Sequence, residues 1–181
     1  LEHQLNDAGV VVLVVLENFA HTVQQVIARS AVRTVVTTQV GDMLPLPKRW
    51  LTNAVVKHLK KLVPAWDLPG AVGWGQVLAA GRGQVFDEVP ITQADLAFLQ
   101  YTGGTTGVAK GAMLTHGNMV ANVMQVGAWI APRLQDGKEV LVIPLPLYHV
   151  FALTGALSFF CHGAKTVLVP NPRDMPAFLR V

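Results

Sequence analysis

Hydrophobic residues in the first forty positions follow two patterns, continuous runs typical of buried strands and the spacing typical of a helix. Val10–Leu16 is an unbroken apolar run with the length of a strand, and it predicts a parallel strand covered on both faces. Apolar residues at helical spacing then predict a helix over Ala20–Arg29. A β-branched run at Thr34–Thr38 predicts a second strand. Strand, helix and strand in this order predict a βαβ unit with a right-handed crossover.

The pattern weakens between Gly41 and Pro90, with one exception. An apolar helical face predicts a helix over Asn53–Leu62, with lysines off that face. Pro64–Pro90 is rich in Gly and Pro and predicts loop. We define the basic patch as five residues of this region, which form either the solvated side of an amphipathic helix or a surface attracted to anionic lipid: Lys48, Arg49, Lys57, Lys60 and Lys61.

A glycine- and threonine-rich loop divides the next pair of predicted strands. The strands are Leu96–Tyr101 and Ala112–Thr115, and the loop is Thr102–Gly111. Thr115 is a candidate N-cap for a helix over His116–Ile130, because a threonine hydroxyl accepts a hydrogen bond from the first turn.

A second βαβ pattern follows this helix. Its strands are Val140–Pro144 and Thr166–Val169, separated by a loop at Leu145–His149 and a helix at Phe151–Cys161. Two such units predict the α/β class, with βαβ units and mainly parallel sheets. We expect two stretches, a partial α/β subdomain at 1–95 and a second α/β segment at 96–181.

Composition narrows the possible classes of protein. The 181 residues are 51% hydrophobic and 14% charged, which excludes a disordered chain. The net charge of +3, from 14 Lys+Arg against 11 Asp+Glu, is too mild to indicate nucleic-acid binding. The single cysteine, Cys161, excludes an internal disulfide and indicates a reducing compartment; we expect it to be buried.

Two further features concern the ends and a possible membrane span. Neither end carries a start or stop signal, so we expect the chain to be a piece of a longer protein. Val140–Cys161 has no charged residue and the length of a bilayer span, but Pro144 and Pro146 favour strand, loop and buried helix.

The loop that follows Tyr101 carries the strongest chemical signal. Its glycines let the backbone approach a ligand, its threonines add hydroxyl donors, and Lys110 adds positive charge. No Asp or Glu occurs between Asp95 and Asp136. The loop lacks the Gly-Lys-Ser/Thr order of a Walker loop and the glycine spacing of a dinucleotide fingerprint. A plain connector is the alternative to a phosphate-binding loop.

Two ordered motifs resemble the adenylate-forming superfamily of acyl-CoA synthetases, luciferases and peptide-synthetase adenylation domains. The first runs from Tyr101 to Gly111 and on to His116, and the second from Pro144 to Phe151. The residues Asp95–Tyr101 and Asn171–Asp174 are most similar to bacterial long-chain fatty acyl-CoA synthetases. The resemblance covers the whole chain, as part of the large N-terminal domain of that fold.

The resemblance implies site residues and substrates. It implies ATP, Mg²⁺, a fatty acid and CoA, which would form an acyl-adenylate and then acyl-CoA. His149 would lie near the reacting carboxylate. Tyr148, Phe151 and Leu153 would line the acyl site, although the apolar residues after His149 could equally be helix core. Thr106 would also touch the metal. The phosphates of ATP would be held by Thr102, Gly103, Gly104, Thr105, Thr106, Gly107 and Lys110.

The alternatives lie within and outside this superfamily. The chain could belong to a ligase for another carboxylate, or to a non-catalytic module that binds nucleotide or membrane. We expect a cytoplasmic protein that is peripherally attached to the inner membrane through the basic patch and is able to form a homodimer. The superfamily's later motifs are absent, so we expect the isolated chain to be inactive. His116 is left outside the site, and His3, His21, His58 and His162 lack the spacing of metal ligands.

Overall fold

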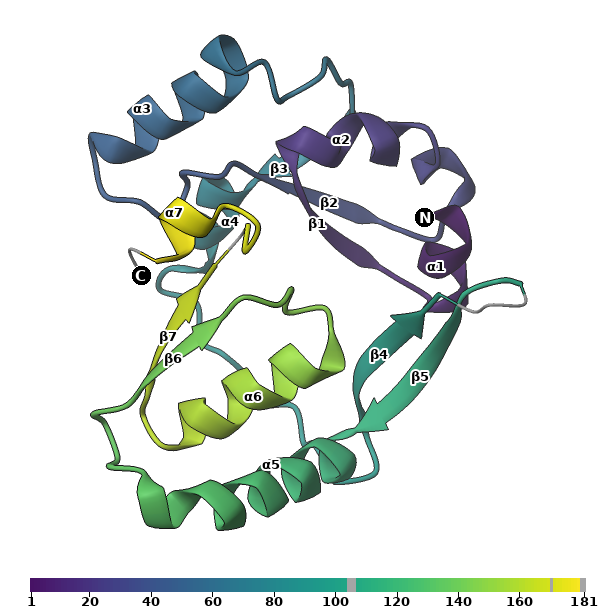
Figure 1. The fold of residues 1–181 in the computed structure, drawn as a ribbon. Coiled ribbons are helices and arrows are strands. Elements are labelled where there is room, and N and C mark those ends of the chain that lie inside the picture. The colour runs from purple at the N-terminus through teal and green to yellow at the C-terminus, as the bar shows by residue number, and fades with distance from the viewer. Residues whose placement is uncertain (104–106, 170, 180–181) are drawn as a thin grey trace. The chain divides into compact units, whose positions relative to one another are not determined.

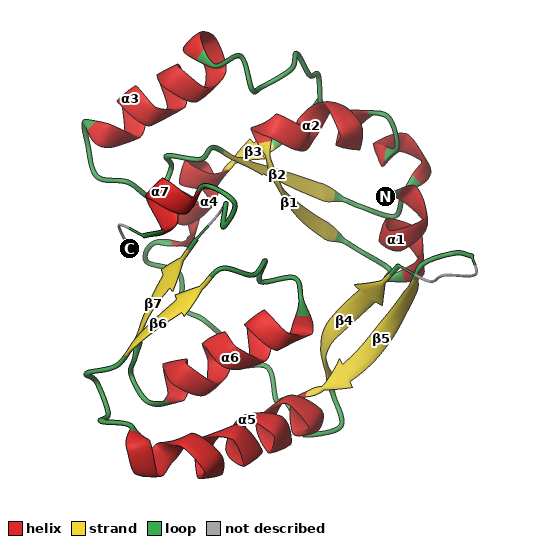
Figure 2. Ribbon diagram, viewed as in Figure 1, coloured by secondary structure: helices red, strands yellow, loops and turns green. Residues whose placement is uncertain are grey.

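The computed structural model describes residues 1–103, 107–169 and 171–179, and the chain forms two compact units. Unit 1 is Leu1–Glu88 and unit 2 is Val89–Val181. Both units combine helices with strands (Figures 1 and 2), and both contain parallel strand pairs. The predicted α/β class with parallel sheets is confirmed.

Unit 1 is built on a parallel three-stranded sheet in the order β1-β2-β3. Its strands are β1 (Val12–Leu16), β2 (Thr34–Thr38) and β3 (Val72–Gly73). Helix α1 (Glu2–Asp7) precedes the sheet, and α2 (Glu17–Gln24) connects β1 to β2. Ala20 and Val23 of α2 are buried against Val35 and Leu68, and this cluster is the core of the unit. The first predicted βαβ unit is therefore present.

The structure corrects two expectations for this region. The predicted helix over Ala20–Arg29 is two pieces, because α2 ends at Gln24 and a 3₁₀ turn occupies Ile27–Arg29. Strand β1 is not covered on both faces: Val12 and Val14 remain 56% and 53% exposed. Strand β1 lies at the edge of the sheet, with α2 packed against it, and its exposed and half-buried side chains alternate.

The basic segment also folds differently from its pattern. Helix α3 spans Lys48–Ala54 and continues as a π-helix over Val55–Leu59, so the helix begins before Asn53 and ends before Leu62. The stretch Pro64–Pro90 is not all loop, because it contains β3 and helix α4 (Trp74–Gly81). The glycines at both ends of α4 conceal it from a search for helical periodicity.

Unit 2 begins with an antiparallel hairpin (Figure 2), whereas the other strand pairs described are parallel. Strand β4 (Leu96–Thr102) pairs with β5 (Lys110–Thr115), and a register shift between Leu96 and Phe98 marks an irregularity in β4. Helix α5 (His116–Ile130) starts where predicted. The Thr115 hydroxyl accepts a hydrogen bond from the Asn118 backbone N–H at 3.2 Å, and the Asn118 side chain accepts one from the Thr115 N–H at 3.1 Å.

A parallel βαβ unit completes unit 2. Strand β6 (Val140–Ile143), helix α6 (Val150–Cys161) and strand β7 (Lys165–Leu168) match the second predicted unit, and α5 packs along α6 (Figure 1). A 3₁₀ turn at Ala131–Arg133 ends α5, and α7 covers Met175–Phe178. Cys161 is exposed, so the expectation that it is buried is wrong. Across the described ranges, no helix is long and apolar enough to cross a bilayer.

Candidate functional site

The hairpin brings the two ends of the predicted phosphate loop together. Thr102 and Lys110 are register partners at its open end, and Tyr101 and Gly111 are the next pair. Directly opposed residues of an antiparallel ladder project from the same face, and successive residues alternate. Thr102 and Lys110 therefore share one face, while the Tyr101 side chain lies on the other.

The segment between these ends is open where it is described. Among the described residues, apart from the adjacent ones in the chain, no atom lies within 4 Å of the position that a Cβ would take on Gly103 or Gly107. Gly107 has a φ of +150°, a conformation that residues with a side chain rarely adopt. Gly104, Thr105 and Thr106 lie outside the described residues.

Gly111 has a separate reason to lack a side chain. A Cβ built on it would lie 3.1 Å from two carbon atoms of the Tyr101 ring. The ring thus lies directly over the Gly111 backbone. The Tyr101 ring therefore covers Gly111 on the face opposite Thr102 and Lys110.

The charges around the open end of the hairpin suit an anion. Lys110 is exposed, and no acidic residue occurs from Leu96 to Gln135. Within the described part of the chain, Lys110 forms no ion pair with a carboxylate. Its ammonium group is therefore free of a competing charge, which favours binding of a polyphosphate.

The base of the hairpin is fixed by Asp95. Its carboxylate accepts hydrogen bonds from the Thr92 backbone N–H at 2.6 Å and the Thr92 hydroxyl at 2.9 Å. These bonds favour the charged form, so the pKa of Asp95 lies below its ordinary value. The Asp95 carbonyl accepts the His116 N–H at 2.9 Å, which ties the start of β4 to the start of α5.

The second motif forms the loop before α6. His149 is the N-cap of this helix: its Nδ1 accepts a hydrogen bond from the Phe151 backbone N–H at 3.3 Å. A backbone N–H can only donate, so Nδ1 must be unprotonated in this arrangement. A neutral His149 then carries its proton on Nε2, which is available as a donor to an oxygen of a ligand.

A side chain of β4 connects the two motifs. The Gln100 side-chain amide Nε2 donates a hydrogen bond to the Tyr148 backbone carbonyl. Gln100 is two residues before Thr102, so both lie on the face of the hairpin that also bears Lys110. Tyr148 and His149 are therefore tied to the Lys110 side of the hairpin. Sequence reasoning missed Gln100, because an unpaired glutamine in a strand has no spacing signal.

An apolar groove of about 430 Å³ opens beside this loop at the carboxyl ends of β6 and β7. Parallel sheets commonly bind ligands at this edge. The groove is lined by aliphatic and proline side chains: Ile143, Pro144, Leu145, Pro146, Leu147, Leu168, Val169 and Pro172. The predicted βαβ unit β6-α6-β7 could have indicated a groove at this edge, because parallel strands end there together.

The residues expected to line the acyl site do not form this groove. Tyr148 and Phe151 are 77% and 72% exposed, and Leu153 is half-buried in the first turns of α6. They follow the groove-lining loop directly in sequence. In unit 2, the described apolar cavity is thus made by the loop and strand ends rather than by α6.

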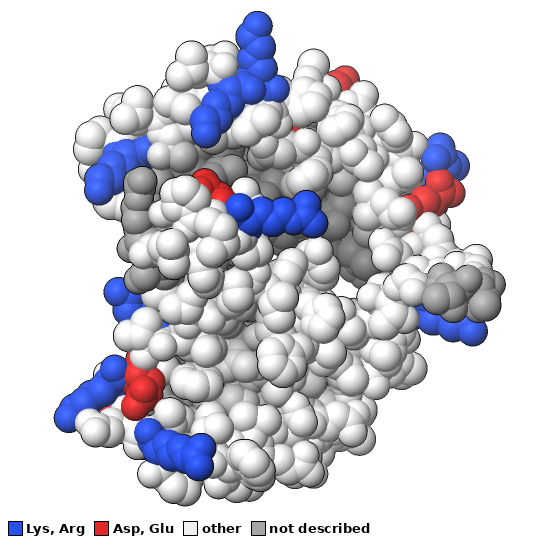
Figure 3. Space-filling model, in the orientation of Figure 1, with Lys and Arg blue, Asp and Glu red and all other residues white. Residues whose placement is uncertain are grey.

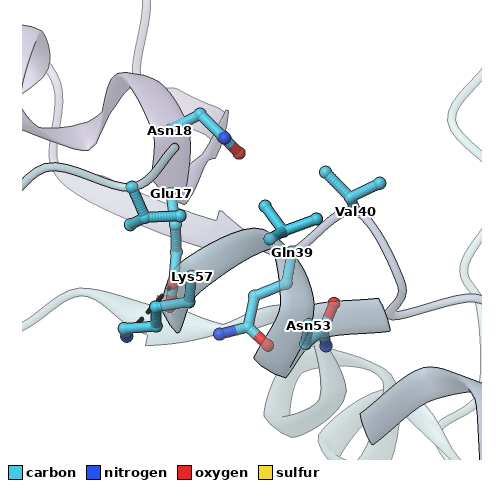
Figure 4. A pocket seen from close by; sticks show the side chains of 8 residues that line it. Glu17, Asn18, Gln39, Val40, Asn53 and Lys57 are labelled. Carbon is cyan, nitrogen blue, oxygen red and sulfur yellow. Dashed lines mark hydrogen bonds and ion pairs between the residues drawn. The ribbon is translucent and has the colours of Figure 1, made fainter. Parts of the chain in front are cut away.

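The basic patch is only partly available to a partner. Arg49 lies 3.5 Å from the Asp42 carboxylate, and Lys57 lies 3.4 Å from that of Glu17. Figure 4 shows the Lys57 side chain turned toward Glu17, beside a small cavity that Gln39 and Asn53 also line. Lys48, Lys60 and Lys61 remain exposed. Figure 3 shows blue side chains over the α3 region and separate blue groups elsewhere.

Acidic, histidine and cysteine side chains are the candidate metal ligands of this chain. In ranges 1–103, 107–169 and 171–179, no three of these side chains lie close enough to hold a metal ion together. His162, at the end of α6, lies 2.8 Å from the Asp136 carboxylate.

Comparison with known proteins gives this arrangement a context. All of residues 1–181 match the model of the AMP-binding enzyme family. The chain is 50% identical to a long-chain-fatty-acid–CoA ligase of Escherichia coli O157:H7 over 99% of its length, and 32% identical to one of Bacillus subtilis strain 168 over 94%. It spans 32% and 30% of those two relatives, about a third of their length.

Solved structures show the same fold. A long-chain-fatty-acid-CoA ligase from Archaeoglobus fulgidus aligns over 92% of this chain and 27% of its own, with a TM-score of 0.57 and 23% identity. A protein from Rhodopseudomonas palustris CGA009 aligns over 94% of this chain and 35% of its own, with a TM-score of 0.68 and 18% identity. With the match over all 181 residues, these comparisons show that the chain belongs to the AMP-binding enzyme family.

Proposed function

We propose that the protein containing this chain is a ligase that activates a long-chain fatty acid with ATP and transfers the acyl group to CoA. The observation that carries the proposal is the placement of Thr102, Lys110 and the Tyr148–His149 loop on one side of a single hairpin. The 50% identity to long-chain-fatty-acid–CoA ligases supports the choice of substrate.

The chemistry needs charge neutralisation more than a general base, because a carboxylate is already a nucleophile. A carboxylate oxygen bonds to the α-phosphorus of ATP, and the bond to the β-phosphate oxygen breaks to release pyrophosphate. Lys110 and the donors of the loop stabilise the charge on the leaving group. The thiol of CoA then attacks the acyl carbon, AMP leaves, and the thiol proton passes to solvent.

Each site residue has a proposed role in these steps. His149 donates from Nε2 to the reacting carboxylate, and Tyr148, Phe151 and Leu153 border the acyl chain. Thr106 is proposed to touch Mg²⁺, which would neutralise phosphate charge when bound. The polyphosphate is held by Thr102, Gly103, Gly104, Thr105, Thr106, Gly107 and Lys110. The proposal divides the chain into two functional stretches, a partial α/β subdomain at 1–95 and the segment with the phosphate loop and acyl site at 96–181.

The test uses the complete protein that contains this chain. Incubation with palmitate, ATP, Mg²⁺ and CoA should release pyrophosphate and form a thioester. Lys110→Ala should lower the rate of pyrophosphate release by roughly 10- to 1,000-fold. Lys138→Ala removes another exposed lysine of unit 2 and is the matched control. Absence of activity in the unmodified protein with fatty acids of every length would contradict the proposal.

We also propose that this protein is cytoplasmic and attaches peripherally to the inner membrane through the basic patch. Four lysines of the patch are exposed, of which Lys57 is paired with Glu17, and no acidic residue lies between Asp42 and Asp67. Trp50 and Leu51 of α3 are 70% and 67% exposed, which offers apolar side chains to the lipid interface. A homodimer formed through exposed apolar surface is the remaining part of the proposal.

Vesicle binding tests the membrane proposal. The protein should bind vesicles that contain anionic phosphatidylglycerol more strongly than neutral phosphatidylcholine vesicles. Lys60→Glu with Lys61→Glu should weaken binding by roughly 10-fold or more, since each basic residue near the surface contributes about 1 kcal/mol. Lys138→Glu with Lys165→Glu makes the same charge change in unit 2. Equal loss in both double variants would show a general charge effect and contradict a role for the patch.

A further inference from the structure

Gln100 joins the hairpin to the Tyr148–His149 loop by a side-chain hydrogen bond within unit 2. The two segments are 48 residues apart in sequence. Both carry motifs that the proposed function uses, whereas Gln100 itself has no assigned role.

The register of the hairpin determines the face on which the Gln100 side chain lies. Gln100 is paired with Ala112, and Thr102 with Lys110, so these four residues share one face of the hairpin. Ala112 is small, which leaves room beside it for a loop to approach. The hydrogen bond therefore draws the Tyr148 carbonyl onto the face that bears Thr102 and Lys110.

The chemistry of the bond is specific for an amide at this position. The acceptor is a backbone carbonyl, so the partner must donate, and the NH₂ of glutamine does. His149 follows the acceptor residue directly, and its ring is held by the Phe151 N–H. Displacing the Tyr148 carbonyl would therefore displace this ring as well.

We propose that Gln100 is a positioning residue that sets the spacing between the phosphate-binding end of the hairpin and His149. The inference rests on the proposed function, because it concerns alignment of the carboxylate with the α-phosphate. Gln100 touches neither substrate. It acts through the Tyr148 backbone, and its loss should reduce the rate of adenylation more than the affinity for ATP.

The experiment compares Gln100→Leu with the unmodified complete protein. Leucine has a similar size but no donor. We expect kcat for palmitate-dependent pyrophosphate release to fall by roughly 10- to 100-fold, with KM for ATP changed less than threefold. Gln125→Leu replaces an exposed glutamine of α5 and controls for the loss of an amide. Gln100→Glu, which keeps the size but cannot donate when ionised, replaces Gln100→Leu if that variant does not fold.

A double-mutant cycle with His149→Ala separates positioning from a general contribution to folding. If Gln100 acts through His149, the Gln100→Leu change should cost little activity in the His149→Ala background. Fully additive losses, or an unchanged kcat in folded Gln100→Leu and Gln100→Glu, would overturn the inference. An unmodified protein without any adenylation activity would instead overturn the proposed function, so the two failures are distinguishable.

Discussion

His149 combines a structural and a proposed chemical role in one imidazole. Nδ1 caps α6 by accepting from the Phe151 N–H, which leaves Nε2 for a ligand. Capping alone needs only a short side chain with an acceptor oxygen, and asparagine supplies it. The two roles can therefore be separated by substitution.

We expect His149→Asn to keep the thermal stability of the protein and His149→Ala to lower it by about 1 kcal/mol. Both variants should lose adenylation activity by roughly 10- to 100-fold, because both lack the Nε2 donor. Thermal unfolding and pyrophosphate release measure the two effects. Full activity in His149→Asn would show that His149 contributes through the helix cap and that the Nε2 donor is not needed for adenylation.

Asp95 gives the turn before β4 a defined pH dependence. The Thr92 backbone and hydroxyl bonds lower the pKa of this carboxyl in the folded state. A lowered folded pKa means that the stabilisation is complete above the unfolded value, about 3.9, and is lost as the pH falls through the folded value. The turn should thus persist to a pH below the ordinary range for aspartate.

An NMR titration of the Asp95 carboxyl carbon tests this directly. Its midpoint should lie below that of an aspartate in a short unfolded peptide. Thr92→Ala removes the hydroxyl bond and keeps the backbone bond, so it should raise the midpoint only part of the way. A midpoint at or above the peptide value would contradict the hydrogen-bond arrangement.

At the scale of elements, the start of α5 depends on Thr115. Its hydroxyl and the Asn118 side chain exchange hydrogen bonds with each other's backbone N–H groups. Thr115→Ala should destabilise the protein by about 1 kcal/mol, and Thr115→Ser should retain most of the stability. Denaturant unfolding measures both changes, and amide exchange in the first turn of α5 should rise only in the alanine variant.

The elements that the sequence predicts well are those with local causes. Thr34–Thr38 and His116–Ile130 appear at the predicted positions, because β-branching and a capping threonine act within the segment itself. The missed features have non-local or concealed causes. Helix α4 is flanked by glycines, and the π-helix at Val55–Leu59 has no pattern that distinguishes it from an α-helix.

The same distinction applies to the candidate site. The Gly/Thr loop and the Tyr148–His149 motif are legible in the sequence, because their residue types carry the signal. The sequence does not reveal that both lie on one side of the hairpin. That placement depends on the antiparallel pairing of Thr102 with Lys110 and on the hydrogen bond from Gln100 to the Tyr148 carbonyl. The apolar groove is equally hidden, since its lining comes from separate strand ends.

At the scale of the whole molecule, large apolar side chains remain on the surface of both units. Val12 and Val14 of β1 and Trp129 and Phe160 of α5 and α6 are each more than half exposed. Exposed apolar side chains promote association when they meet those of another molecule. The proposed dimer is one form that such association could take.

The 181-residue chain alone should therefore associate as its concentration rises, and it should release no pyrophosphate from ATP and palmitate. It spans about a third of its ligase relatives, so we expect it to lack groups that complete the reaction. Analytical ultracentrifugation and a pyrophosphate assay check the two expectations. Sustained turnover by this chain would show that the required groups lie within it.

The close contact between the Tyr101 ring and Gly111 fixes the register of β5 relative to β4. Side chains alternate along a strand, so an extra residue between Gly111 and Met113 would reverse the side of every later position of β5 relative to β4. The Tyr101 ring would still lie over Gly111. Ala112 would no longer be paired with Gln100, and the later residues of β5 would be shifted out of register with β4. An insertion or deletion within either strand should consequently disrupt this pairing.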